Sequence, residues 1–409
     1  MMQNEPEECF PAQAASVPAA GKSAGNYPCR PLAAAVAGFA ALLAGCANLG
    51  YYAQAVEGHL AIQQRTRPIS EVVGDSTTAE NLKRSLSVVS ALREFAVREL
   101  RLPNNGSFTT YADLGRPYAV WNVSAAPELS MELEKWCFVA VGCVSYRGFF
   151  SMSEAERFAQ ELRAKGYDVA LGGVRAYSTL GWFREPLLNT FLGYSDTEMA
   201  QLIFHELAHQ VVHVRDDTAF NESFATAVEL EGINRWLDRN GTEAQREAFI
   251  ASRKRKTSYT TILLEYRARL KRLFASGESD VEKRETKARI FDELHEKLAD
   301  FGTAKAAVRR APVAPTKLNN ADLATVSTYT GLVPAFQALL QQQGGNLPLF
   351  YERVKEIARL PAPERMAVLR EVEASASANG MDAGSAGPVI QGMADRQNPA
   401  IASRLNDND

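Results

Sequence analysis

Two histidines lie one helical turn apart in a segment that has its own start signal. Ser195 is followed three residues later by Glu198, which forms a capping box, and the sequence TEMAQLIFHELAHQVV continues with helical character. His205 and His209 therefore project from the same face of the predicted helix. Two imidazoles in this register can share one tetrahedral ion, so the segment predicts a metal site.

The residue after the first histidine indicates which reaction such a metal site would catalyse. Glu206 completes the pattern H-E-x-x-H, which is a signature of zinc peptidases. Because Glu206 follows His205 by one position, its side chain points about 100° away around the helix and is expected to reach water rather than the ion. This interpretation makes Zn²⁺ the cofactor, His205 and His209 its ligands, and Glu206 the catalytic general base. The alternative is a pair of histidines that serve only the packing of the helix.

A second predicted helix supplies the third ligand. Its sequence FNESFATAVE contains Asn-Glu-x-x-Ala, which resembles the gluzincin arrangement of thermolysin-like peptidases and alanyl-aminopeptidase-like enzymes. The resemblance implies that Glu222 binds zinc and that Glu229, two turns further on, orients a ligating histidine. Only residues 210–221 separate Glu222 from His209, fewer than in those enzymes, and thermolysin's spacing would instead make Glu229 the ligand.

Peptide hydrolysis also needs a hydrogen-bond donor for the developing oxyanion. We expect Tyr177 or Tyr329 in this role, and Tyr194 and His213 are further candidates. His213 continues the histidine stripe, and we expect it to support the metal site rather than to bind the ion. The predicted strand at residues 174–183 could supply a sheet edge on which an extended peptide lies.

Further motifs extend the resemblance along most of the chain. The whole sequence resembles a family of predicted aminopeptidases among bacterial lipoproteins, over Cys46 to Val372. The resemblance rests on the lipobox described below and on the segments VGCVSYRGFFS, RAYSTLGWF, FHELAHQ, FNESFAT and LNNADL…TYTGLVPAF. It implies a zinc-dependent peptidase, and specifically an aminopeptidase, that acts on peptide substrates.

Two other functions remain open at this point. The protein could be an endopeptidase or processing factor of the cell envelope, or a catalytically inactive zinc-binding envelope lipoprotein. An aminopeptidase must anchor a free α-amine with an additional acid, and the candidates are Glu185, Asp216, Asp217 and Glu229. The sequence leaves the choice among them open, together with residue specificity, physiological substrate and oligomeric state.

The N-terminal region predicts export. The apolar run PLAAAVAGFAALLAGC is too short for a comfortable transmembrane helix and ends in small residues, as a signal peptide does. Leu43-Ala44-Gly45-Cys46 resembles a bacterial lipobox, which implies cleavage before Cys46 and its lipidation. Ala47 then implies sorting to the outer membrane, with the protein facing the periplasm. The acidic residues near Met1 make a poor start for a signal peptide, so translation could begin further downstream.

Composition and charge limit the kinds of partner that this protein is expected to bind. The formal net charge is -3, which gives no general attraction to nucleic acid. The basic cluster Arg253–Lys256 is flanked by acids and is interpreted as a solvated helix face. No obligate protein partner is evident, so the expected partners are a peptide substrate and a membrane reached through the lipid. Cys137 and Cys143 could form a disulfide in an oxidising compartment or remain two buried thiols.

The pattern of elements predicts an α+β, mostly helical fold. A zincin-like (gluzincin) core has a small sheet before the H-E-x-x-H helix, and helices precede and follow it. The expected segments are a lipoprotein signal peptide (1–45), an N-terminal helical and strand region (46–150), the zincin-like catalytic core (151–240), a charged helical hairpin (241–310), C-terminal helices (311–372) and a disordered tail (373–409).

Overall fold

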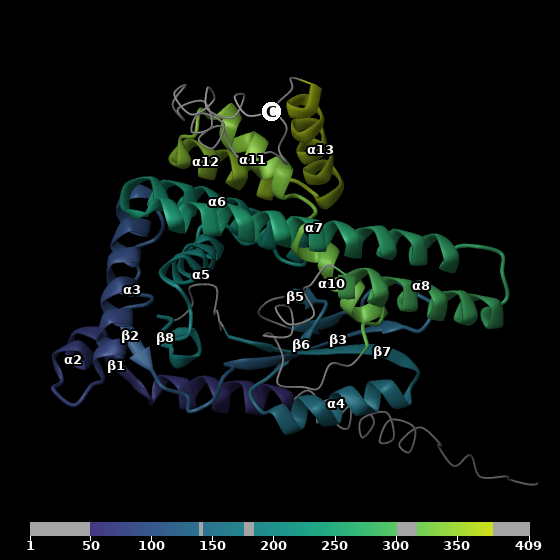
Figure 1. The fold of residues 1–409 in the computed structure, drawn as a ribbon, viewed down its shortest axis with the longest axis horizontal. Coiled ribbons are helices and arrows are strands. Elements are labelled where there is room, and N and C mark those ends of the chain that lie inside the picture. The colour runs from purple at the N-terminus through teal and green to yellow at the C-terminus, as the bar shows by residue number, and fades with distance from the viewer. Residues whose placement is uncertain (1–49, 139–141, 176–183, 301–316, 379–409) are drawn as a thin grey trace, which may run out of the picture. The chain divides into compact units, whose positions relative to one another are not determined.

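The computed structural model describes residues 50–138, 142–175, 184–300 and 317–378. The fold is α+β and mostly helical, as predicted (Figure 1). Residues from Gln54 onward form one compact unit. Among the described residues, no helix combines the length and the apolar character needed to cross a membrane.

Helices make up most of the described chain. Residues 50–63 are helical, and Asn189–Phe191 form a short 3₁₀ turn. The α-helices are α2 (Ile69–Gly74), α3 (Glu80–Glu99), α4 (Met152–Ala164), α5 (Asp196–His209), α6 (Thr218–Asn240), α7 (Glu243–Phe274), α8 (Asp280–Asp300), α10 (Asn320–Thr330), α11 (Val333–Gln342), α12 (Leu347–Ala358) and α13 (Ala362–Ala378). The last helix continues beyond the boundary that we predicted at residue 372.

In the described part of the chain the strands are short and fall into three small sheets rather than one. They are β1 (Thr66–Pro68), β2 (Thr110–Ala112), β3 (Val120–Pro127), β4 (Trp136–Phe138), β5 (Gly142–Val144), β6 (Arg147–Phe149), β7 (Tyr167–Val174) and β8 (Leu187–Leu188). Strand β3 pairs antiparallel with β6 and β7, β2 lies between β1 and β8, and β4 pairs with β5. Cys137 and Cys143 therefore lie opposite each other on two antiparallel strands.

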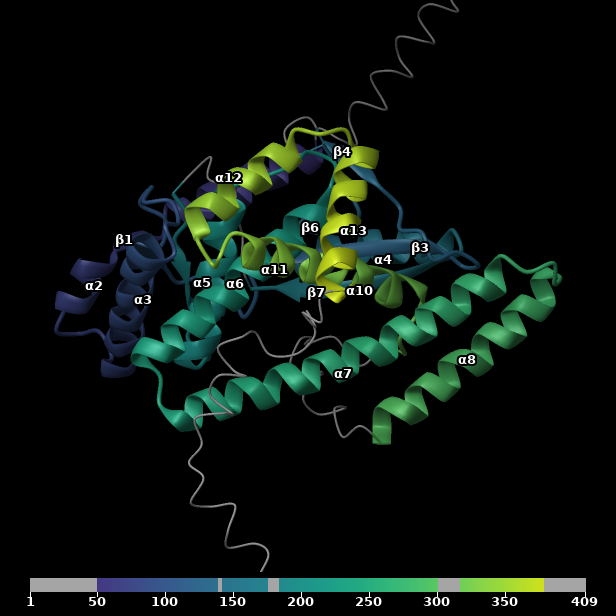
Figure 2. The same cartoon turned by 90° about the horizontal axis from the view of Figure 1, so that it is seen from above.

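The main hydrophobic core surrounds α5 and α6. The two helices pack closely, and a Cβ atom at Gly232 of α6 would lie 2.7 Å from the ring of Phe204 on α5, so glycine permits this approach. On the other side of α6, Phe224 packs edge-to-face against Phe336 of α11 and stacks on Phe350 of α12. Helix α6 thus lies between α5 and the C-terminal helices α11–α13 (Figures 1 and 2).

Helices α7 and α8 form the antiparallel hairpin expected after residue 241. A second hydrophobic core joins them to α10 through residues such as Leu270, Leu294 and Leu323. Lys287 of α8 donates to Asp168 at the start of β7, at 2.7 Å. The hairpin is therefore attached to the sheet that precedes the histidine helix.

Candidate metal centre

The histidine helix begins where the sequence predicts. The Glu198 amide donates to Ser195 Oγ, and the Ser195 amide donates to the Glu198 carboxylate at 2.9 Å, so both halves of the capping box are present. This start sets the rotation of α5. Its apolar face is buried, and His205 and His209 lie together on the side that faces α6.

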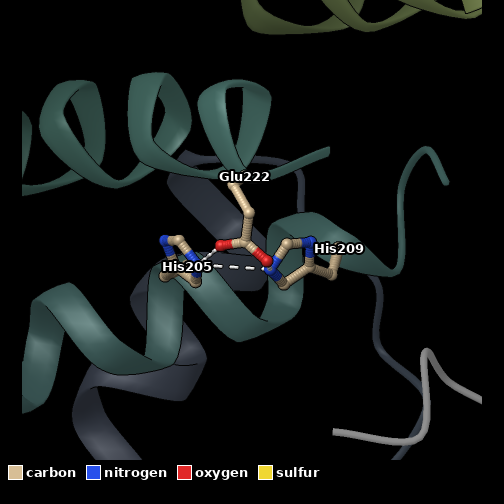
Figure 3. A group of neighbouring side chains, drawn as sticks. All are labelled: His205, His209 and Glu222. Atoms are coloured by element: carbon tan, nitrogen blue, oxygen red, sulfur yellow. Dashed lines mark hydrogen bonds and ion pairs between the residues drawn. The ribbon is translucent and has the colours of Figure 1, made fainter. Parts of the chain in front are cut away.

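The three predicted metal ligands meet at one point (Figure 3). His205 Nε2 lies 3.2 Å from His209 Nε2 and 3.3 Å from Glu222 Oε2. The other oxygen of Glu222 lies 3.8 Å from His209 Nε2. The two histidines come from α5 and the carboxylate from α6, so the packing of these two helices brings the group together.

Glu229 contacts His205 on its other ring nitrogen. Glu229 Oε2 lies 3.1 Å from His205 Nδ1, and Gln201 donates to Glu229 Oε1 at 2.8 Å. When Nδ1 of a neutral His205 donates to this carboxylate, its Nε2 carries a lone pair directed at Glu222. Glu229 therefore orients the His205 ring, and Gln201, which holds Glu229 in turn, was not predicted from the sequence.

The residues present fit a zinc ion. Lone pairs of His205 Nε2 and His209 Nε2 and an anionic carboxylate of Glu222 converge, which is repulsive unless a positive charge lies among them. Two imidazoles and one carboxylate are also a donor set of catalytic zinc sites, in which one position stays open. The buried Nδ1 of His209 has no hydrogen-bond partner in the described part of the chain.

The pKa values of the two histidines also indicate that this group favours one positive charge. Burial lowers the pKa of His205, but hydrogen bonds to Glu222 and Glu229 outweigh it and raise this pKa to about 10. Burial and the positive charge on His205 lower the pKa of His209 to about 4. Without a metal, one proton on His205 thus supplies the positive charge that the carboxylates require.

Glu206 is available for proton transfer. It is half-buried on α5 and has no hydrogen bond to any described residue. Burial raises its pKa to about 7, opposed by the positive charge of His205 and assisted by the negative charges of Glu185, Glu222 and Glu229. A carboxylate with a pKa near neutrality can both accept and donate a proton, as a general base and acid must.

The start of α6 is anchored from the far end of the chain. Asp217 is the N-cap and accepts from the Phe220 amide at 3.0 Å. Its other oxygen accepts two hydrogen bonds, at 2.7 and 3.1 Å, from the buried guanidinium of Arg365 on α13. Asp217 lies just over one turn before Glu222, so this ion pair positions the turn that carries Glu222.

The loop between the ligand helices is held by Asn221, the residue that precedes Glu222. Its side-chain oxygen accepts from the Val214 amide and its NH₂ group donates to the Val214 carbonyl, both at 2.8 Å. Asn221 is buried. The asparagine of Asn-Glu-x-x-Ala therefore has a structural task that motif comparison alone did not assign.

Our prediction for the end of the histidine helix is wrong. We expected the helix to continue to Val212, but α5 ends at His209 and Gln210 is its C-cap. His213 therefore does not continue the histidine stripe, and it lies exposed in the loop. It is not part of the three-residue ligand group, and its charge only contributes to lowering the pKa of His209.

The oxyanion candidates are only partly visible. Tyr177 lies outside the described residues, as does most of the predicted strand 174–183, and the side chain of Tyr329 in α10 is likewise not described. Tyr194 packs against the main core, and the guanidinium of Arg175 lies 5.0 Å from its ring. Tyr177 and Tyr329 therefore remain predictions.

The four candidate acids for an α-amine have different surroundings. Asp217 and Glu229 are engaged with Arg365 and His205, as described above. Asp216 is exposed, has a positive φ of 64°, and accepts a hydrogen bond from the Cys143 amide. Glu185 is buried and accepts from Gln210 at 3.2 Å, just past the end of α5.

The two cysteine predictions fall on different parts of the chain. Cys137 and Cys143 form a disulfide that closes the β4–β5 hairpin, and this hairpin contacts the loop between the ligand helices through Asp216. Cys46 and the signal-peptide segment lie outside the described residues.

Comparison with known proteins agrees with the chemistry of this centre. A family model described as "Putative aminopeptidase" matches residues 50–369, which include both ligand helices and α10–α12. No curated protein and no solved structure matches the chain. The match covers more than half of the sequence and indicates a peptidase. The chain therefore belongs to the putative aminopeptidase family.

Proposed function

We propose that this protein is a zinc-dependent aminopeptidase of the bacterial cell envelope, with a gluzincin-like core and a lipid anchor at Cys46. The observation that carries the proposal is the convergence of His205, His209 and Glu222 beside a hydrogen-bond-free Glu206. The family match supports peptidase activity. The lipobox supports the location, on the outer membrane and facing the periplasm.

His205, His209 and Glu222 would hold the zinc ion. When bound, zinc supplies Lewis acidity, which polarises a scissile carbonyl and lowers the pKa of water. Glu206 accepts a proton from the attacking water and then delivers it to the leaving amine. Glu229 keeps the proton of neutral His205 on Nδ1, so that Nε2 remains a ligand.

The sheet before α5 supports the binding of an extended peptide. β7 is an edge strand, because it pairs only with β3 in its sheet among the described strands. Asn319 at the N-cap of α10 donates to the Val169 carbonyl at 3.0 Å, so part of this edge is already covered. The part of β7 after Val169 is the part that would receive substrate by strand addition.

The α-amine of a substrate needs a carboxylate near Glu206. Of the four acids considered, Asp217 caps α6, Glu229 contacts His205 and Asp216 is exposed, whereas Glu185 is buried and its charge acts on Glu206. We therefore assign Glu185 as the acid that positions the α-amine. An N-acetylated peptide would lack this interaction and should be a poor substrate.

Replacement of Glu206 tests the proposal. Glu206→Gln keeps size and polarity but removes the base, so zinc content should stay equal while turnover of a free-amine peptide falls by about 10²–10⁴. Zinc content is measured by elemental analysis, and hydrolysis is measured on a peptide panel with free and acetylated N-termini. A zinc-loaded wild-type protein that hydrolyses no peptide would contradict the proposal, and equal cleavage of acetylated peptides would indicate an endopeptidase.

A further inference from the structure

A cavity of about 410 Å³ shares no lining residue with the metal centre. Its walls come from the N-terminal helix at residues 54–63 (purple in Figure 1) with Arg65, from the loop that precedes β3, and from the start of α4. None of the residues that line it belongs to α5 or α6. A volume of this size accommodates a small organic molecule.

Hydrogen bonds and close packing fix the wall between the N-terminal helix and the end of β6. Gln54 donates to the Gly148 carbonyl at 3.4 Å and accepts from the Phe150 amide at 3.2 Å, so both ends of its side-chain amide are used. A Cβ atom at Gly58 would overlap the ring of Phe150, so glycine permits this approach. The elements around the cavity are therefore held in place by their own contacts.

Two arginines line the cavity without a carboxylate partner. Arg65 donates from Nη1 to the carbonyls of residues 113 and 114, at 3.4 and 3.0 Å. Arg116 donates to the carbonyl of Ala119 at 2.9 Å and to that of Phe150. Nη2 of Arg65 and Nε of Arg116 have no hydrogen-bond partner among the described residues, and neither arginine forms an ion pair with one of them. Both guanidiniums thus retain unused donors.

The charges of the two arginines repel each other. Burial lowers the pKa of Arg116, and the positive charge of Arg65 lowers it further. No ion pair with a described carboxylate offsets this repulsion. An anionic group bound by both guanidiniums would offset it and would also take up their unused N–H donors.

The same cavity is lined by two acids. Glu57 and Glu154 contribute to its walls, and neither carboxylate forms an ion pair or a hydrogen bond with any described residue. Two cationic and two anionic side chains therefore surround one cavity without pairing with each other. A simple anion would be attracted by the arginines but repelled by the acids, whereas a ligand with charges of both signs would complement all four.

We propose that this cavity binds a small zwitterion, whose anionic group contacts Arg65 and Arg116 and whose primary ammonium contacts Glu57 or Glu154. Guanidinium groups bind carboxylates and phosphates through paired hydrogen bonds, and an ammonium group donates three. Two molecules have this chemistry, a free amino acid and the phosphoethanolamine headgroup of a lipid. The inference goes beyond the proposed peptidase function and does not depend on it.

Calorimetry on the full chain with soluble probes tests the site and distinguishes the two sources. Leucine represents the free amino acid, and glycerophosphoethanolamine represents the headgroup. The wild-type protein should bind at least one of them. The counterparts that lack one charge are N-acetyl-leucine and leucine amide for the first probe, and glycerol phosphate for the second. Each should bind about 10- to 100-fold more weakly than its parent, as the loss of a charge-assisted hydrogen bond suggests.

Variants of the charged residues connect binding to this cavity. Glu57→Gln combined with Glu154→Gln should weaken binding about 10- to 100-fold, and it should fold, because neither side chain forms a hydrogen bond with a described residue. Arg116→Gln should have a similar effect on binding, and Arg116→Lys should restore part of the affinity because it keeps the charge. Arg67→Gln is the matched control, since this exposed arginine pairs with Asp75 and does not line the cavity.

A probe held at the metal centre would give a different pattern. Its binding should be lost in Glu222→Ala and should not respond to the paired glutamate variant, and this result would overturn the role of the cavity. Failure of folded wild-type protein to bind either probe would also overturn it. So would equal affinity for a probe and for its counterpart without the ammonium, because an anion alone would then suffice. Cavity-dependent binding by a protein that hydrolyses no peptide would instead contradict only the peptidase function.

Discussion

Two hydrogen bonds join the side chain of Asn221 to the backbone of Val214. The Asn221 side chain satisfies both the N–H and the C=O of Val214, and it does so from the residue next to Glu222. The loop that leaves the histidine helix is thereby tied to the helix that brings the carboxylate. Metal binding and loop conformation should therefore change together.

Replacement of Asn221 should weaken both stability and zinc binding. Asn221→Ala leaves the polar groups of Val214 unpaired, which costs about 1–3 kcal/mol of unfolding free energy. Asn221→Asp should cost more, since a carboxylate would face the Val214 carbonyl. Urea unfolding and zinc competition with a chelator measure the two effects. Asn240→Ala, at the exposed end of the same helix, is the control, and equal effects of both alanine variants would refute the role of Asn221.

The two acids of α6 should differ in their effect on zinc. Glu222→Ala removes a ligand and should abolish stoichiometric zinc after dialysis. Glu229→Ala removes the partner of His205 and should weaken zinc binding by only about 10–100-fold. Glu231→Ala, on the same helix but paired with Arg235, should leave the affinity unchanged. The opposite order of Glu222 and Glu229 would reassign the third ligand.

The ion pair between Asp217 and Arg365 should show strong coupling. Arg365→Ala leaves a partly buried carboxylate without its partner and should cost about 3–5 kcal/mol. Asp217→Asn in the same chain keeps the cap and removes that charge, so the double variant should be more stable than Arg365→Ala alone. Denaturant unfolding of the complete cycle measures this coupling. Arg370→Ala is the exposed control on α13, and simple additivity in the cycle would show that the two residues act separately.

Asp322 should make stability depend on pH. Burial raises its pKa to about 6, assisted by the charge of Asp168 and opposed by the Asn319 backbone hydrogen bond. Because the folded pKa is the higher one, the folded state binds more protons, and this contribution to stability is complete below about pH 4 and is lost as the pH rises through 6. Its slope is at most about 1.4 kcal/mol per pH unit.

Asp322→Asn retains an acceptor for the Asn319 amide and removes the titration. The difference in unfolding free energy between variant and wild type should therefore grow in favour of the variant from pH 4 to pH 6.5. Urea midpoints across this range give the measurement. A constant difference would mean that Asp322 titrates alike in the folded and unfolded states.

Cys46 should determine where the protein is found. Cys46→Ser removes the thiol that the lipid would modify, so the variant should accumulate uncleaved or without lipid. Membrane fractionation and mass spectrometry of the N-terminal peptide test this. Recovery of wild-type protein from the soluble periplasm without lipid on Cys46 would refute the anchor.

Local rules predicted the parts of the fold that depend on neighbours in sequence. The capping box at Ser195 and the spacing of His205 and His209 depend on one helix alone, and the structure places both as expected. Helical periodicity likewise indicated the α7–α8 hairpin. The small sheets were harder to predict, because strands of three residues carry little alternation.

Residues whose roles depend on distant contacts could not be predicted. Helix α5 ends in a loop that is held by Asn221 of α6. No Gly or Pro follows His209 closely in the sequence, so this end could not be predicted. Arg253 belongs to a run of four basic residues, but it is partly buried and contacts the Phe249 ring, whereas Lys254 is exposed. Arg365 supports the start of α6 from 148 residues away.

The 148 residues between Asp217 and Arg365 affect when this site can form during synthesis of the chain. Chains are made from the N-terminus, so both ligand helices exist well before α13 has been translated. Until then Asp217 lacks the cation that neutralises it, and the turn that carries Glu222 lacks its anchor. The group of His205, His209 and Glu222 therefore has its anchor at Arg365 only when the C-terminal helices have been made and have docked. A nascent or prematurely terminated chain would carry every ligand residue and still lack a finished site.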